Sequence, residues 1–118
     1  MVRPAALAWL PEAPEEAFAE LVALLGGDPD PSVRQTAAHA LRGHGEPAVA
    51  PLARAFSVDE DYGTRLTCAS SLAALGDAGV AALEDLLART GDETPAPPLP
   101  FMARRATLLD MLARRKTR

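Results

Sequence analysis

The chain repeats at an interval of 31 residues, and this period constrains the fold more than any other feature. Successive copies align in columns of like residues. The columns are Arg3, Arg34 and Arg65; Ala6, Ala37 and Cys68; Leu10, Leu41 and Leu72; Phe18, Val49 and Val80; Leu21, Leu52 and Leu83; and Leu25, Phe56 and Leu87. A fixed period of this length is typical of a solenoid, in which each unit buries its apolar face only against its neighbours.

The middle unit, residues 28–58, has the pattern of a helix–turn–helix. Asp30-Pro31 indicates a helix start, because Asp accepts from free backbone N–H groups and Pro fits the first turn. Glycines at 43 and 45 indicate the end of that helix, and Pro47 starts a second one. Apolar residues follow at helical spacing, with Val33, Ala37, Ala38 and Leu41 in the first helix and Val49, Leu52, Ala55 and Phe56 in the second.

The whole chain is predicted to be one all-α domain, a short right-handed α-solenoid of about three helix pairs plus a C-terminal helix. The units span about residues 1–27, 28–58 and 59–89. The first unit departs most from the repeat pattern, as expected of a capping unit. Four prolines within 90–100 predict an extended linker before a basic helix over 101–118. In that helix Arg105, Leu108 and Leu112 repeat the spacing of the Arg column, which predicts a first helix without its second. Such a helix either caps the stack or docks on another subunit.

Charge is unevenly distributed, with a net −9 over the first 100 residues and +5 over 101–118. The body therefore lacks the clustered cations that a phosphate-binding surface needs. Cys68 is the only cysteine, stands in a column of alanines, and is expected to be a small buried core residue. The sequence has no apolar run long enough to span a membrane and no secretory signal pattern at its start, so we expect a cytoplasmic protein.

The units resemble HEAT repeats, specifically the short bacterial type seen in phycobilisome-lyase-like proteins. The matching stretches are DPDPSVRQTAAHALRGHGEPAVAPLARAF and DEDYGTRLTCASSLAALGDAGVAALEDLL. The resemblance covers about residues 1–89 and implies that the second helices line a concave face. HEAT-like arrays serve as scaffolds, adaptors, bilin-lyase subunits and, in one family, DNA glycosylases, so the resemblance alone does not choose a function.

The Arg column has two interpretations. Asp30 and Asp61 lie four residues before Arg34 and Arg65, on the side that favours a helical ion pair. Asp28 and Asp59 precede them in the turns between units. We favour an Asp–Arg ladder that ties successive units together and caps helices, as the resemblance implies. The alternative is contact with phosphate.

The second-helix face is the predicted partner-binding surface, with an alanine column as its floor and charged walls. Its candidate residues are Glu16, Ala19, Glu20, Ala50, Arg54, Ala81, Glu84 and Asp85. The alternative is that the acidic residues only keep this face soluble, and Glu15 and Glu16 also favour a helix N-terminus.

A second set of residues is predicted to form oligomer or tail contacts. They are Trp9, Arg104, Arg105, Leu109, Arg114 and Arg115. Trp9 either covers the open N-terminal end of the stack or anchors an interface, where tryptophan is enriched. The basic end, residues 114–118, is either a nucleic-acid or membrane-surface contact or a solvated terminus that favours the helix dipole.

No motif in the sequence indicates catalysis or a bound cofactor. His39 and His44 have no third ligand in a metal-binding spacing and are interpreted as surface or turn residues. The chain has few aromatic residues and an acidic body, which argues against a glycosylase that extrudes a base. The predicted function is non-catalytic protein–protein binding as an adaptor or scaffold, with a possible homodimer. The alternatives are nucleic-acid binding through the C-terminal helix and an accessory subunit of a lyase-type enzyme.

Overall fold

The computed structural model describes residues 14–91, 93 and 97–116, and in this part of the chain every regular element is helical. The α-helices are α2 (Pro14–Gly27), α3 (Pro31–Ala40), α4 (Val49–Val58), α5 (Tyr62–Ala74), α6 (Asp77–Arg89) and α7 (Arg104–Lys116). Short 3-10 helices are η1 (Leu41–His44), η2 (Glu46–Ala48) and η3 (Pro100–Met102). The prediction of an all-α repeat solenoid is confirmed. Residues 1–13 of the first predicted unit lie outside the described residues, as does part of the linker predicted over 90–100.

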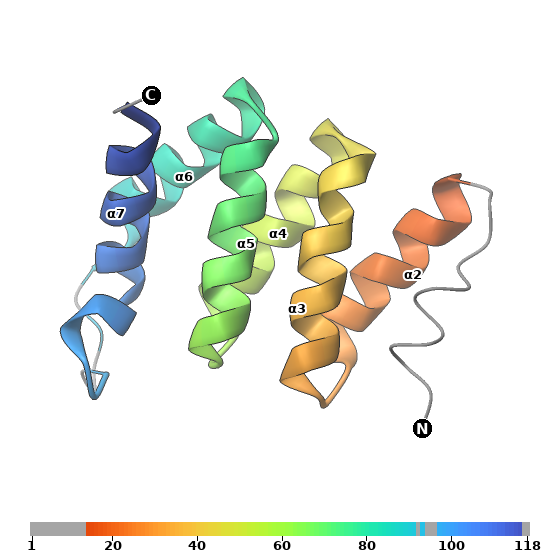
Figure 1. Cartoon of the computed structure of the whole chain (residues 1–118), viewed down its shortest axis with the longest axis horizontal. Coiled ribbons are helices and arrows are strands. Elements are labelled where there is room, and N and C mark those ends of the chain that lie inside the picture. The colour runs from red at the N-terminus through yellow and green to blue at the C-terminus, as the bar shows by residue number, and fades with distance from the viewer. Residues whose placement is uncertain (1–13, 92, 94–96, 117–118) are drawn as a thin grey trace.

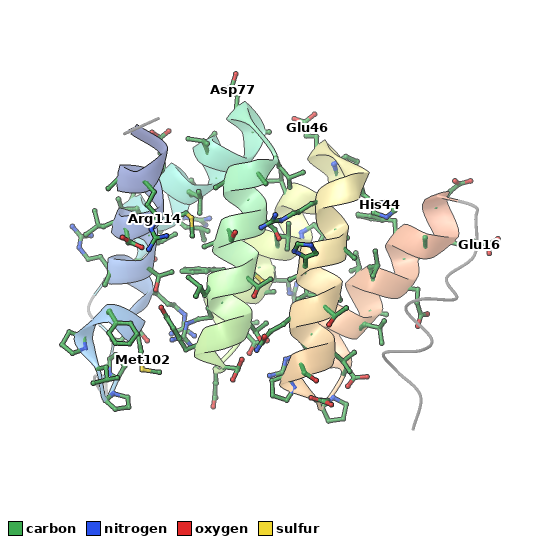
Figure 2. All side chains as sticks on the ribbon, viewed as in Figure 1. Glu16, His44, Glu46, Asp77, Met102 and Arg114 are labelled. Atoms are coloured by element: carbon green, nitrogen blue, oxygen red, sulfur yellow. The ribbon has the colours of Figure 1, made fainter. Side chains whose placement is uncertain are left out.

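The helices form two layers (Figure 1). The first helices of the units, α3, α5 and α7, stand side by side, and each second helix packs against the first helix that follows it, as α2 does on α3 and α4 on α5. The turns between units lie along one edge of this stack. The turns within units lie along the other edge, where Glu46 and Asp77 project (Figure 2).

Local side-chain caps start the helices of the first layer. Asp30 is the N-cap of α3 and accepts from the backbone N–H of Ser32, and Pro31 follows in the first turn. Asp61 is the N-cap of α5 and accepts from the N–H of Thr64 at 2.8 Å. Burial raises the pKa of Asp61, but the hydrogen bonds from Thr64 and Gln35 outweigh it and leave that pKa below its ordinary value. The helix starts predicted from Asp30-Pro31 and Asp61 are confirmed.

Glycine sets the turn within each described unit. Gly45 and Gly76, one period apart, both adopt a positive φ, 71° and 80°, which side-chain-bearing residues rarely adopt. The first helix of the middle unit was expected to end at the glycines at 43 and 45. The α-helix α3 instead ends earlier, at Ala40, and the chain continues as the 3-10 helix η1 up to His44. Gly79 has a different role: a Cβ there would lie 1.7 Å from the Leu72 carbonyl oxygen, so the close approach of α6 to α5 requires glycine.

The repeated apolar columns form the core. Leu21, Leu52 and Leu83 are all fully buried, and so are Leu41 and Leu72. The column of small residues, Ala37 and Cys68, is also inaccessible to solvent. Cys68 is fully buried, as expected of a small core residue, and this burial raises the pKa of its thiol to about 12.

Helix α7 packs on its own stack, against α5 and α6. Leu108 is fully buried in this contact and belongs to the same core as the apolar columns. The order of buried and exposed residues along α7 matches that along α5 when Thr107 and Leu108 are aligned with Thr64 and Arg65. The alignment of Arg105 with the Arg column is therefore wrong, since Arg105 is exposed and leucine stands in the arginine position.

Candidate functional site

The Arg column ties the second unit to the third. Arg34 donates to both carboxylate oxygens of Asp59, from Nε at 2.8 Å and from Nη2 at 3.2 Å, and its Nη1 donates to the Asp28 carbonyl at 2.9 Å. This two-pronged contact with Asp59 raises the pKa of Arg34. Within the described residues the expected Asp–Arg ladder has one such contact, and its acid comes from the next unit. Asp30 and Asp61, four residues before the arginines, cap helices instead.

Arg65 has no carboxylate partner of this kind. Its guanidinium donates to the backbone carbonyls of Asp59, Glu60 and Met102, at 3.1, 2.9 and 2.8 Å. Burial, together with the nearby cation of Arg104, lowers its pKa. Both arginines of the described column therefore bind groups within the protein, which removes the support for phosphate contact through this column.

Arg104 lies inside the same network. Its guanidinium pairs with Glu93 at 2.6 Å and donates to the carbonyls of Phe56 at 3.2 Å and Asp59 at 2.9 Å. Only 20% of its side chain is exposed. The prediction that Arg104 makes oligomer or tail contacts does not fit this arrangement, because its charge is already used within the protein.

The predicted partner-binding residues are largely accessible. The alanine column Ala19, Ala50 and Ala81 is exposed on three successive second helices, and so are Glu16, Arg54, Glu84 and Asp85, while Glu20 is half-buried. Asp85 pairs with Arg89 one turn further along α6 at 2.6 Å, so it is not a free charge.

Two hollows open on the described surface, and each takes residues from this predicted set. The first, here called the α2–α4 groove, has a volume of about 610 Å³ and includes Arg54. Its apolar lining comes from both helices: Val22, Leu25, Pro51, Ala55 and Val58. None of the three column alanines lines it, so the hollow lies beside the alanine column rather than on it.

Two glycines open the α2–α4 groove. Gly26 and Gly27 end α2 at the positions where the later units carry Ser57-Val58 and Ala88-Arg89. A Cβ added at either glycine would meet nothing within 4 Å. The break in the column at these two glycines is visible in the sequence, but the sequence alone did not indicate a hollow there.

The second hollow, here called the α6–α7 groove, lies at the end of the stack and has a volume of about 600 Å³. It brings Glu84 from the predicted partner face together with Arg105 and Leu109 from the predicted contact set. Leu87, Ala88, Leu112 and Ala113 complete its lining.

The remaining candidates do not form a site. Arg114 pairs with Asp110 on its own helix at 3.0 Å. Trp9 and the side chain of Arg115 lie outside the described residues. His39 is exposed, whereas the ring of His44 packs 5.6 Å from that of Phe18. Among the described residues no group of three potential ligands is placed to hold a metal ion, and no described helix is long and apolar enough to cross a membrane.

Comparison with known proteins identifies the family. A family model for HEAT repeats matches residues 1–60 and 18–97. No match was found among the curated proteins or among the solved structures. HEAT repeats generally mediate protein–protein interaction and are typically non-catalytic. The stacked helix pairs, the Asp–Arg contact between units and the family match together show that the chain belongs to the HEAT repeat family.

Proposed function

We propose that the protein is an adaptor or scaffold that holds a short segment of a partner protein in the α2–α4 groove. The observation that carries this proposal is an open apolar hollow with an exposed, unpaired guanidinium on its wall. Arg54 has no ion-pair or hydrogen-bond partner within the described part of the chain. Concave, mostly apolar surfaces with a few placed polar groups are typical binding sites.

The lining of the groove defines the partner chemistry. Val58 is 67% exposed, a large value for an apolar side chain, and it lies next to Arg54 one turn back on α4. Glu60 supplies an exposed carboxylate in the same hollow. A helical segment with an apolar side chain over Val58, a carboxylate near Arg54 and a cation near Glu60 would complement this surface.

Selection of peptides tests this proposal without knowledge of the natural partner. Peptides selected from a random displayed library against the full chain should combine apolar and acidic residues and bind in the micromolar range. Arg54→Glu and Val58→Asp should each weaken them about tenfold or more. Arg89→Glu is the matched control, since it reverses an exposed arginine that lines neither hollow.

A filling substitution gives an independent test. Gly26→Leu places a side chain in open space and replaces a helix-breaking residue, so the fold should keep or gain stability. Peptide binding should be lost. Full binding by Gly26→Leu, or equal losses in Arg54→Glu and Arg89→Glu, would show that the α2–α4 groove is not the binding site.

No specific observation in the described structure supports the two alternative functions, nucleic-acid binding and a role as a lyase subunit. Of the cations that suggested a nucleic-acid contact, Arg104 is used inside the protein and Arg114 pairs with Asp110. Nucleic-acid binding, a lyase-associated role and a cytoplasmic location stay sequence-based predictions.

A further inference from the structure

The α6–α7 groove exposes a face that the earlier units bury. Leu25, Phe56 and Leu87 occupy one column, yet Leu25 and Phe56 are 2% and 0% exposed while Leu87 is only partly buried. The α6 residues that line this groove, Glu84, Leu87 and Ala88, are in register with α2 residues that line the α2–α4 groove. There, α4 stands opposite α2. No second helix within the described residues stands in the matching place beside α6 and α7.

The groove is apolar and lies between two charges of opposite sign. Leu109, on the α7 side, is 47% exposed, which is unusual for leucine on a helix that otherwise packs on its stack. Glu84 and Arg105 line opposite walls, and neither has an ion-pair or hydrogen-bond partner within the described part of the chain. Unlike the Asp85–Arg89 pair, these two charges are available to another molecule.

The arrangement of these groups is self-complementary. Helices α6 and α7 run in opposite directions (Figure 1), and Glu84 on α6 lines the same hollow as Arg105, which lies in the first turn of α7. A two-fold axis near Leu109 would set two α7 helices antiparallel. The second copy's Arg105 would then lie near Ala113, which lines the groove together with Glu84, and the same Glu84–Arg105 ion pair would form twice.

We propose that the protein forms a homodimer through the α6–α7 groove, with the second copy's α7 covering the face that a further second helix would cover. Two-fold dimers are the commonest closed assemblies, and they use one surface twice. Leu109 packs against its own equivalent at the axis, and two Glu84–Arg105 pairs fix the orientation. This surface is separate from the α2–α4 groove, so the dimer does not rest on the proposed partner binding.

Sedimentation velocity of the full chain over a wide concentration range tests the dimer. The wild type should self-associate, and Leu109→Glu should be monomeric at every concentration. Glu84→Arg and Arg105→Glu should each weaken association about tenfold or more, and the double charge swap should restore it. Leu66→Glu is the control, since Leu66 is 37% exposed on α5 and lies outside the groove. A monomeric wild type, or a double swap as weak as the single variants, would overturn the proposal.

Disulfide trapping tests the axis itself. A residue near a two-fold axis meets its own equivalent, so Leu109→Cys should cross-link into a dimer under mild oxidation. Leu66→Cys should not, and the buried Cys68 should stay unreactive in both variants. Circular dichroism confirms that each variant is folded. Equal cross-linking of both variants, or none in Leu109→Cys, would place the contact elsewhere or rule it out.

Discussion

The two junctions at either end of the third unit use the same arginine column in different ways. At the junction between the second and third units, Arg34 binds the Asp59 carboxylate one unit away, and 18% and 8% of the two side chains are exposed. At the junction with α7, Arg65 donates to the backbone carbonyls of Asp59, Glu60 and Met102 instead of a carboxylate. The carboxylate at this junction belongs to Glu93, which pairs with Arg104 and not with Arg65.

The difference shows what happens where the period is interrupted. Within the 31-residue register, Asp59 supplies its carboxylate to Arg34 of the preceding unit. The register position matching Asp59 is Thr90, which has no carboxylate. A linker then brings Glu93 and Arg104 together, and Glu93 also accepts from the backbone N–H of Arg104 at the start of α7. Both junctions combine apolar packing with an ion pair, but the regular junction pairs equivalent register positions, whereas the last junction takes its acid from the linker.

The largest effect is expected when the packing of α7 is removed. Leu108→Ala should lower the free energy of unfolding by about 2–5 kcal/mol, because a fully buried leucine leaves a cavity. Urea denaturation measures the loss. Leu66→Ala, at a half-exposed site on α5, should cost much less, and similar losses for both variants would contradict the burial of α7.

Loss of the Arg34–Asp59 ion pair between the second and third units should give the next largest decrease in the free energy of unfolding. Arg34→Met keeps an apolar stem but leaves the nearly buried Asp59 carboxylate without its cation, at a cost of about 2–3 kcal/mol. Asp59→Asn and the double variant complete a cycle that isolates the pair. Additive losses in this cycle would mean that the two side chains do not interact.

Arg104→Met should cost less, about 1–2 kcal/mol, because its pair with Glu93 is more exposed and its other partners are neutral carbonyls. Amide hydrogen exchange locates the change: protection should fall in α7 before it falls in α3 and α5. Uniform loss of protection through the stack would contradict a separately held last junction.

The loss of stability from removing the Asp61 helix cap, and its dependence on pH, should be smaller than these effects. The folded-state pKa of Asp61 is lowered from an ordinary 3.8, so its contribution is full above that pH and is lost as pH falls through the folded-state value. Asp61→Ala should reduce stability by about 1 kcal/mol at neutral pH and show less further loss on acidification. Thermal melts from neutral pH to below pH 4 measure both, with Asp77→Ala, outside the junctions, as the control.

The sequence alone was sufficient for features that act over a few residues or that recur with the period. Asp30 and Asp61 start helices through hydrogen bonds to residues two or three positions away. Gly45 and Gly76 set the turns, and the leucine columns became the core because every unit offers its neighbour the same face. Four of the candidate surface residues line the two hollows: Arg54, Glu84, Arg105 and Leu109. The sequence had indicated them only as members of longer candidate sets.

The tertiary structure alone decided which distant groups meet. Arg65 reaches Met102, Arg104 reaches Phe56, and Arg42 donates to Ser70, over separations of 37, 48 and 28 residues that no column predicts. It also decided that one hollow lies where Gly26 and Gly27 leave the wall open and that the other lies between α6 and α7. A periodic sequence specifies contacts between equivalent positions, because each unit repeats the same geometry. Where the period breaks, packing in three dimensions selects the partner, and local sequence carries no information about it.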